Sequence, residues 1–598
     1  MNTAAHHDWQ DRIGQASGEP AAASRPGLEA PTGLRAVPGV GQVTLTWDPV
    51  PGAIGYLVHR DGAPAAQPDV DVPAVPSCRF VDTGHGAAAY SVAAVSAMDH
   101  VGPLSPEVHA EPLPAAPGAP ASSVSVRVDA RRVTGEPARP WAYMVGSEHL
   151  SHLLSTDETG GRPIGEELAG ALRIVRDELG VQTVRAHAIL CDDLGVYKEV
   201  DGRAVHDFSR VDEVYDTVVA LGLRPIVELS YMPRDLAADP TKTVFGYGAI
   251  VSPPKDFEAW SDLVRALVEH LADRYGIQEL IDHWAFEVWN EPNLAVFWSG
   301  TPEEYFLLYD VTAAAVKYVH PDLRVGGPAS AANGWVEELL AHVAESGAAL
   351  DFLSTHTYGN APLDWRPALA RYGMDVPVWW TEWGPTPTHF HGVGDGPFGA
   401  SFLLHGMKSA AGRIAALSHW VASDHFEELG RPPRLFHGGF GLLTVGNLRK
   451  PRFHALTLAA RLGDAELAAT LDGDVGGVEV WAARHDDGRI GVLVWNGTLN
   501  HAQAAGAPEL ARTVTLTVDG LDGARTLTHH RIDAGHSNVE AAWQSMGGGD
   551  WPAGEQWDEL RAGNTLEELA PARRVEGGTV TLEFELPMPG VSFIELTP

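Results

Sequence analysis

The stretch DFEAWSDLVRALVEHLADRYG, residues 256–276, and the stretch HWAFEVWN, residues 283–290, decide how this chain folds. Apolar residues recur in the first stretch at intervals of three and four, which places them on one face of a helix, and Gly276 marks its end. The second stretch has the length and apolar composition of a buried strand. Together they predict a helix that covers one face of a sheet.

The same alternation of strand and helix extends in both directions from this pair, over roughly 280 residues, near the size of about 250 residues that is typical of a (β/α)₈ barrel. Eight strands are the number that closes such a barrel. We therefore predict a TIM barrel over residues 136–455, and the strand count disfavours the rival architecture, a doubly wound open sheet. The predicted strands are 141–147, 182–190, 224–230, 283–290, 324–330, 352–358, 377–384 and 414–424.

The N-terminal region differs in pattern from the barrel. Residues 1–27 are polar, Ala-rich and without periodicity, which predicts a disordered lead-in. Residues 28–111 contain short alternating β segments and an Asp-Gly turn, which predict a small β-sandwich. The order of Trp47, Tyr56 and Tyr90 in this segment resembles a fibronectin type III domain. Residues 112–121 are rich in Pro and Ala and are interpreted as a linker.

The C-terminal region returns to period-two alternation. Segments such as VEVWAARHDDGRIGVLVWN, TVTLTVDGL and VTLEFELP predict an all-β sandwich domain over residues 456–598. The run SVSVRVDARRV lies just before the barrel, within residues 122–135, and is expected to add one strand to that domain. The chain is thus predicted to be multidomain, with the barrel between two β-sandwich units.

Charge and cysteine content restrict the classes of partner. The chain has 598 residues and a formal charge of −36, which would repel nucleic acid and anionic membranes and disfavours polyanionic ligands. Only Cys78 and Cys191 are present, so neither a disulfide framework nor a cysteine-based zinc site is expected. The N-terminus has no apolar core of a signal peptide, and a cytoplasmic location is expected. A neutral ligand fits this composition best.

Two acids follow predicted barrel strands. Glu291 comes after the fourth strand and Glu382 ends the seventh. The catalytic groups of a (β/α)₈ barrel lie at the carboxyl ends of its strands, so the two side chains should meet at one mouth. Cleavage of a glycosidic bond requires two such carboxyl groups. A single Glu at a strand end is more often a structural residue, but the pair in this setting favours glycosidase chemistry.

WNEPN at residues 289–293 and TEWG at residues 381–384 resemble the clan A glycoside hydrolases, and the surrounding sequence is similar to family 39, which contains β-xylosidases and α-L-iduronidases. The similarity covers roughly residues 120–598. It includes VGSEH at 145–149, VRAHAILCDDLGVY at 184–197, PIVELSYMP at 225–233, STHTYG at 354–359, SDHFEELGRPPRLFHGGFGLL at 423–443 and RIDAGHSNVEAAWQSMG at 531–547. The resemblance implies a retaining mechanism in which Glu291 is the acid/base and Glu382 the nucleophile.

The remaining candidate residues would bind the sugar or adjust the two carboxyls. Asn290 is implied to bind the sugar 2-hydroxyl, while Arg185 and Tyr358 are candidates for the cation and the hydrogen-bond donor that keep Glu382 ionised. Aromatic side chains near the two acids could pack on sugar rings and raise the pKa of an acid, although several are expected to be core residues. The other candidates are His149, His187, His356, Phe297, Trp298, Trp383, Trp420, Glu427 and Phe436.

These patterns predict a retaining exo-glycosidase, with β-xylosidase activity on short neutral oligosaccharides or glycosides as the first expectation. Another glycone of the same mechanism is the alternative: an arabinoside, glucoside or galactoside, and less readily an iduronide. A non-catalytic carbohydrate-binding protein with a degenerate barrel is the rival from another class, and the presence of both acids disfavours it. No cofactor and no metal are expected. The sequence leaves a homo-oligomer open.

Overall fold

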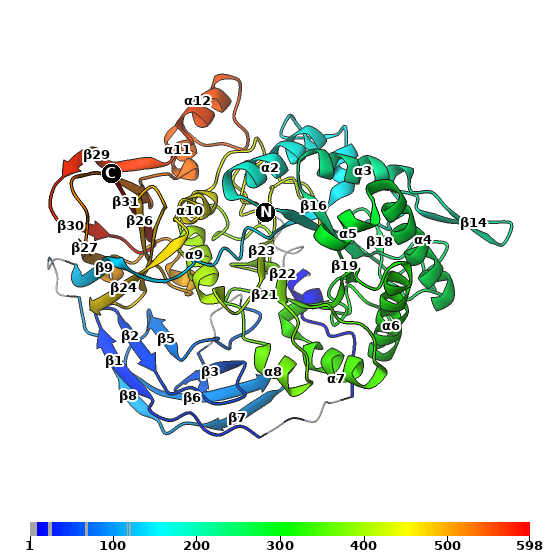
Figure 1. The fold of residues 1–598 in the computed structure, drawn as a ribbon, viewed down its shortest axis with the longest axis horizontal. Coiled ribbons are helices and arrows are strands. Elements are labelled where there is room, and N and C mark those ends of the chain that lie inside the picture. Colours follow the sequence, from blue (N-terminus) through cyan, green and yellow to red (C-terminus); the bar gives the residue numbers. More distant parts are fainter. Residues whose placement is uncertain (1–8, 22–24, 26, 66–69, 116–117, 119–120) are drawn as a thin grey trace.

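The computed structural model describes residues 9–21, 25, 27–65, 70–115, 118 and 121–598. Its centre is a closed barrel of eight parallel strands, which confirms the predicted TIM barrel (Figure 1). All eight predicted strand segments contribute. In barrel order the strands are β10 (Met144–His149), β13 (Thr183–His187), β16 (Arg224–Leu229), β19 (Ala285–Val288), β20 (Val325–Ser330), β21 (Phe352–Tyr358), β22 (Val378–Gly384) and β23 (Ala416–His419).

Helices cover the outside of the barrel (Figure 1). The helix predicted from the opening stretch is α4, whose N-terminus is capped by the Asp256 side chain and which ends at Gly276. Its predicted apolar face, from Trp260 to Leu271, is buried. The barrel helices are α2 (Ile164–Leu179), α3 (Ser209–Ala220), α4 (Phe257–Tyr275), α5 (Ile277–His283), α6 (Pro302–Val319), α7 (Val336–Ser346), α8 (Arg366–Arg371), α9 (Phe398–Ala410) and α10 (Pro451–Ala460).

The predicted end of the barrel at residue 455 falls inside α10, which packs against α9 and α2. The helix is continuous there because Phe453, Leu456 and Leu458 are all buried against the barrel. The change to β structure therefore follows Ala460.

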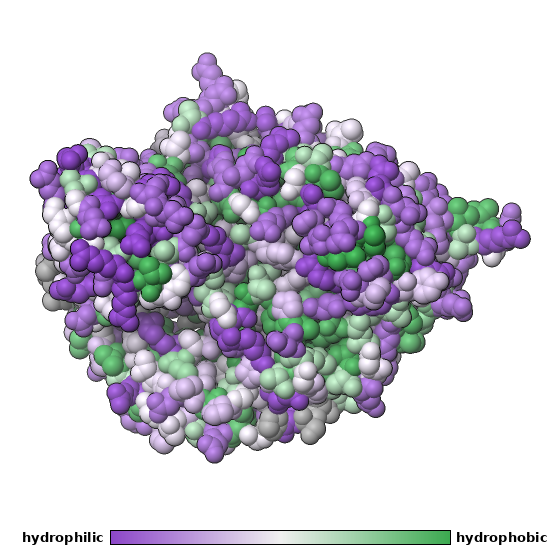
Figure 2. Space-filling view, viewed as in Figure 1, coloured by the Kyte–Doolittle hydropathy of each residue, from purple (hydrophilic) through white to green (hydrophobic). Residues whose placement is uncertain are grey.

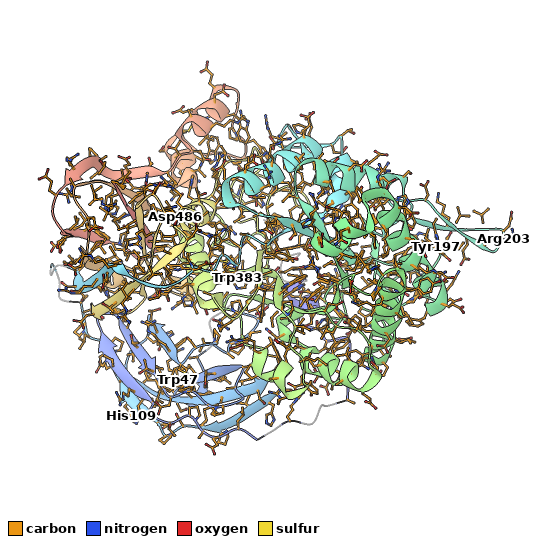
Figure 3. The ribbon with its side chains drawn as sticks, viewed as in Figure 1. Trp47, His109, Tyr197, Arg203, Trp383 and Asp486 are labelled. Carbon is orange, nitrogen blue, oxygen red and sulfur yellow. The ribbon has the colours of Figure 1, made fainter. Side chains whose placement is uncertain are left out.

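The loops of the barrel contain several short strands and 3-10 helices. The hairpin of β14 (Tyr197–Val200) and β15 (Arg203–His206) projects from the barrel, with Arg203 at its far end (Figures 1 and 3). The other short elements are η1 (Leu150–Leu154), β11 (Glu158–Thr159), β12 (Arg162–Pro163), β17 (Thr243–Val244), β18 (Ala249–Ile250) and η2 (Ala331–Asn333).

The C-terminal β-rich domain is one continuous nine-stranded sheet. Strand β9 (Ser122–Gly135) joins it between β24 and β27, so the segment before the barrel pairs with strands far along the sequence. Valines of β9, β26 and β27 share one hydrophobic core with Ile594 and Leu596 of β31, which shows that the sheet folds over itself. The further elements are β24 (Ala465–Gly473), β25 (Val478–Arg484), β26 (Ile490–Asn496), β27 (Arg512–Asp519), β28 (Arg525–Ile532), β29 (Glu567–Val575), β30 (Thr579–Leu586), β31 (Gly590–Thr597), η3 (His501–Gln503), η4 (Pro508–Leu510), α11 (Val539–Ser545) and α12 (Glu555–Gly563).

Two further sheets form the N-terminal unit, which lies against the barrel below it in Figure 1. Trp47 and Tyr56 pack edge to face in its core (Figure 3). One sheet contains β1 (Arg35–Gly39), β2 (Gln42–Thr46) and β5 (Arg79–Thr83). The other contains β3 (Gly55–Arg60), β4 (Ala63–Pro64), β6 (Ala88–Ala97), β7 (His100–Leu104) and β8 (Val108–Ala110).

The prediction of disorder over residues 1–27 does not hold for residues 9–21, which the structure places on the barrel. Residues 9–13 are helical, and Trp9 is only 6% exposed because its ring packs against Phe245 and Phe297. The polar composition of the segment gave no sign of this contact, because a single tryptophan, Trp9, supplies the large apolar side chain that makes it. The remaining part of the prediction lies largely outside the described residues.

The molecular surface is predominantly hydrophilic on the face shown in Figure 2, with small apolar areas scattered among polar ones. Among the described helices, none has the length and apolar character that crossing a membrane requires.

Candidate active site

Glu291 lies directly after β19, in a segment where the backbone turns sharply. Both Trp289 and Glu291 have positive φ, at 69° and 43°, a conformation that non-glycine residues adopt at a cost. The Glu291 amide donates to the carbonyl of Ala329, and its own carbonyl accepts from the amide of Leu294. This turn holds the Glu291 carboxyl at the barrel mouth, where it lines a cavity.

Glu382 reaches the same cavity from β22. In the pairing of β21 with β22, Thr355 lies opposite Trp380 and His356 lies opposite Glu382, so Thr381 is an extra residue. A bulge of this kind changes which side chains of a strand face inward. It sets Glu382 beside His356, whose own side chain contacts Glu291.

The two carboxyls are close together. One oxygen of Glu291, one oxygen of Glu382 and one ring nitrogen of His356 all lie within 4.8 Å of one another. Retaining glycosidases hold their carboxyl groups about 5–5.5 Å apart, whereas inverting enzymes need about 6.5–9.5 Å to admit a water molecule. The short separation is the retaining arrangement.

Two donors stabilise the ionised form of Glu382. Arg185 Nη1 donates to Glu382 Oε1 at 2.5 Å, and the Tyr358 hydroxyl donates to Oε2 at 2.7 Å. Burial raises the pKa of Glu382, while the Arg185 charge and these hydrogen bonds lower it. Both neighbours are therefore placed where the sequence analysis expected the cation and the donor.

Glu291 has no cation in direct contact among the described residues, and its pKa is raised further than that of Glu382. Burial and the nearby negative charge of Glu382 raise the pKa of Glu291 well above its usual range. His356 Nδ1 lies 2.8 Å from Glu291 Oε1, and its Nε2 contacts Thr381 Oγ1 at 3.1 Å. Burial, followed by the charge of Arg185, lowers the pKa of His356 well below its usual range, so a neutral imidazole faces Glu291. Burial raises the pKa of both carboxyls, and the pKa of Glu291 is raised further than that of Glu382.

Arg185 lies at the centre of this network and is fully buried. Its guanidinium also pairs with Glu228 and, through Nε at 2.8 Å, with Glu287. Its Nη2 donates to the Asn290 side-chain oxygen at 2.9 Å, while the Asn290 amide donates to the Tyr231 hydroxyl at 3.2 Å. The amide of Asn290 is thus fixed in orientation beside the two carboxyls.

The cavity at the mouth has a volume of about 370 Å³, within the range of about 300–1,000 Å³ that is usual for small-molecule sites. Its described lining includes no lysine or arginine, whereas four of its residues are acidic: Asp71, Glu291, Glu382 and Glu428. The predicted residues that line it are Asn290, Glu291, Phe297, Tyr358, Glu382, His187 and Trp420.

Several predicted binding residues lie outside the described lining of this cavity. The Trp383 ring stacks on Phe402 of α9, and Trp298 packs in the core against Trp289; Trp383 is labelled in Figure 3. Phe436 belongs to a separate cluster with Trp543 and Trp557. His149 contacts Ser151, and Glu427 contacts His152. His356 and Arg185 lie beneath the two carboxyls and contact them.

The acid that enters the cavity from the loop after β23 is Glu428, next to the predicted Glu427. Its Oε1 lies 3.4 Å from His187 Nε2, and its pKa is raised well above the usual range, first by burial and then by Glu148. The sequence motif contained both acids, but a loop has no periodicity from which to tell which one faces inward. Glu427 instead pairs with His152 and Arg431.

Among the residues that the structure describes, two groups of side chains have the donor types of a metal site. One is the set of Glu291, His356 and Glu382 already described, and the other is Glu148, His149 and His152. In the second group the donors have protein partners: His149 contacts Ser151, His152 contacts Glu427, and Glu148 accepts from the amide of Glu427.

A (β/α)₈ barrel whose mouth holds two carboxyls this close together has the arrangement of a glycoside hydrolase. The model of glycosyl hydrolases family 39 matches residues 124–370 and 366–579, and the chain belongs to this family.

Relatives agree with this assignment. A β-xylosidase of Geobacillus stearothermophilus is 32% identical over 489 residues, which cover 76% of this chain and 92% of that protein. The crystal structure of a monomeric β-xylosidase from Caulobacter crescentus is 31% identical with a TM-score of 0.70, and the match covers 79% of this chain and 99% of that one. A mouse α-L-iduronidase is 25% identical over 475 residues, covering 70% of this chain and 72% of that protein.

Proposed function

We propose that this protein is a retaining β-xylosidase that releases one neutral sugar from the end of an oligosaccharide or glycoside. The observation that carries the mechanism is the pair Glu291 and Glu382, within 4.8 Å of each other and unequal in electrostatic setting, since the pKa of Glu291 is raised further than that of Glu382. The β-xylosidase relatives, each about one-third identical over most of the chain, support the choice of xylose. The absence of lysine and arginine from the described cavity lining favours a neutral sugar over a uronate.

The reaction proceeds in two displacements. Ionised Glu382 attacks the anomeric carbon, and Glu291 gives its proton to the departing glycosidic oxygen, which leaves a covalent glycosyl ester on Glu382. Glu291 is then a carboxylate and removes a proton from a water molecule, which attacks the anomeric carbon and frees Glu382. Two inversions retain the anomeric configuration.

The glycone would be held by polar groups around the nucleophile. Asn290 is oriented by Arg185 and Tyr231 and is proposed to bind the 2-hydroxyl. His187 and Glu428 approach each other across the cavity wall and would bind hydroxyls on the far side of the ring. Trp420 would pack on its apolar face.

The experiment that tests the function is hydrolysis of a panel of 4-nitrophenyl glycosides: β-D-xyloside, α-L-arabinosides, β-D-glucoside, β-D-galactoside and α-L-iduronide. We expect the highest kcat/KM on the β-D-xyloside, with β-xylose as the first product anomer by NMR. Preference for another glycone would retain the mechanism but reject the xylosidase proposal. Release of the α-anomer first would reject retention.

A pH prediction follows from the two carboxyls. The rate should fall as pH drops through the pKa of Glu382, which must be ionised, and as pH rises through the pKa of Glu291, which must be protonated. The Glu291→Gln variant is assayed on 2,4-dinitrophenyl β-xyloside, whose leaving group needs no proton. Its kcat/KM should no longer fall at high pH (the alkaline limb of the pH profile) but should still fall at low pH (the acidic limb). Stopped assays from pH 4 to 9 measure both limbs; an alkaline limb that persists in this variant would assign it to another group.

The N-terminal unit of residues 28–111 is proposed to be a fibronectin type III-like domain. Two antiparallel sheets support this proposal, one of β1, β2 and β5 and one built on β3, β6 and β7. They pack around a core that includes Trp47, Tyr56 and Tyr90.

A further inference from the structure

Two segments that lie outside the family match of residues 124–579 reach the catalytic cavity. Residues Trp9, Gln10, Ile13 and Gly14 of the N-terminal segment line it, and so do Val70 and Asp71 of the N-terminal unit. The segments are far apart in sequence and approach the cavity independently. Both segments meet at the cavity beside Glu291, where they can contact a bound substrate.

The N-terminal segment is attached to the loop that directly follows Glu291. The Ser17 amide donates to the carbonyl of Asn293 at 3.0 Å, and the Ala295 amide donates to the carbonyl of Gln15 at 2.8 Å. The Ser17 hydroxyl also donates to the carbonyl of Pro292 at 2.6 Å. Backbone pairing of this kind fixes residues 9–17 against the loop, while the ring of Trp9 packs on Phe297.

Asp71 is attached to the end of β21. Its Oδ2 accepts from the amide of Tyr358 at 2.8 Å, and its amide donates to the Tyr358 carbonyl at 3.3 Å. The Asn360 side chain adds two hydrogen bonds, to the carbonyls of Val72 and Ala74. Oδ1 of Asp71 is enclosed and accepts no hydrogen bond from the described residues. A carboxyl oxygen held this firmly without a partner calls for a ligand.

The positions of these groups indicate which part of a substrate they meet. His187, Trp420 and Glu428 come from the second and eighth strands and surround the glycone. Residues 9–14, Asp71, Leu294 and Ala331 lie by the ends of the fourth, fifth and sixth strands. Glu291 donates its proton to the oxygen that joins the glycone to the leaving group. Residues 9–14 and Asp71 lie near Glu291, at other strand ends than the residues proposed for the glycone, and are therefore placed to meet the leaving group.

We propose that the N-terminal segment and Asp71 form the leaving-group subsite, and that this subsite takes a second sugar ring. This inference rests on the proposed function. Trp9 and Ile13 supply apolar area, while Gln10 and Asp71 supply hydrogen-bonding groups for hydroxyls, a combination that suits a pyranose. Burial raises the pKa of Asp71 to about 8, so near neutral pH its carboxyl can give or accept a hydrogen bond.

The test compares a disaccharide and an aryl glycoside of the same glycone, because the aryl leaving group has no hydroxyls. In Asp71→Asn the amide oxygen can still accept from the Tyr358 amide, so the fold of β21 is preserved. We expect kcat/KM for β-1,4-xylobiose to fall about tenfold in Asp71→Asn and several-fold in Gln10→Ala. The value for 4-nitrophenyl β-xyloside should change by less than about twofold. Asp61→Asn is the matched control, since Asp61 is exposed in the same unit and its carboxylate accepts from the nearby Ala89 amide.

Each result decides the question. Equal losses on both substrates would assign Asp71 to the glycone or to support of Tyr358 and overturn the proposal, as would no change on either. A wild-type enzyme that cleaves the aryl glycoside but not the disaccharide would show that the subsite takes no sugar. A wild-type enzyme that cleaves no glycoside would overturn the proposed function itself.

Discussion

Glu382→Ala is expected to lower kcat by at least about 10⁴-fold, because removal of a covalent nucleophile leaves only binding and electrostatic contributions to catalysis. The loss should not reflect unfolding. Arg185 keeps Glu228 and Glu287 as partners in the variant, so no buried charge is left alone. Circular dichroism and the unfolding temperature should therefore stay close to those of the wild type.

Sodium azide separates the two catalytic roles. In Glu382→Ala, azide can occupy the vacated space and attack the anomeric carbon of an activated β-xyloside once, which gives the α-xylosyl azide. In Glu291→Ala, the glycosyl ester on Glu382 still forms, and azide then attacks it to give the β-xylosyl azide. NMR of the products measures the configuration. A β-azide from Glu382→Ala would contradict its assignment as the nucleophile.

The barrel and the catalytic pair were accessible from the sequence because both depend on strong local patterns. The alternation of short apolar runs with amphipathic helices defined all eight strands. Since the carboxyl ends of parallel strands meet at one mouth, Glu291 and Glu382 could be brought together without coordinates. Arg185 and Tyr358 were proposed from the same rule; Tyr358 is the last residue of β21, whereas Arg185 lies two residues before the end of β13.

Some predicted binding residues, such as Trp383, lie outside the described cavity lining because the prediction did not take side-chain direction into account. Successive residues of a strand point to opposite faces, so Trp383 had to face away from the cavity if Glu382 faced into it. The pattern itself contained that information. The choice between Glu427 and Glu428 had no comparable signal, because both lie in a loop. The bulge at Thr381 was equally hidden, as it depends on pairing with β21.

The contacts of the N-terminal segments with the cavity could not be predicted at all. They join Ser17 with Pro292 and Asp71 with Tyr358, pairs separated by 275 and 287 residues. No local periodicity encodes such contacts. A polar, Ala-rich segment was interpreted as disordered, although the burial of Trp9 against Phe297 is enough to position it.

Arg185→Met is expected to lower the free energy of unfolding by about 3–5 kcal/mol, the usual cost of removing one partner from a buried ion pair. Arg185 is fully buried and is the cation shared by Glu228, Glu287 and Glu382. Methionine fills much of the volume but leaves these carboxyls without their counter-charge. Urea unfolding followed by fluorescence measures the change. Arg274→Met is the matched control: its pair with Asp216 is exposed to solvent, so this substitution should lower the free energy of unfolding far less than Arg185→Met.

The same variant should change the pH dependence of the residual activity in a defined direction. The charge of Arg185 lowers the pKa of Glu382, so its removal raises that pKa further. Glu382 must be ionised to attack, and the acidic limb of kcat/KM should therefore move to higher pH in Arg185→Met. Arg185→Lys keeps the charge but loses the several simultaneous hydrogen bonds of the guanidinium, so its limb should lie between those of the wild type and Arg185→Met. An acidic limb that stays in place in Arg185→Met would mean that another group keeps Glu382 ionised.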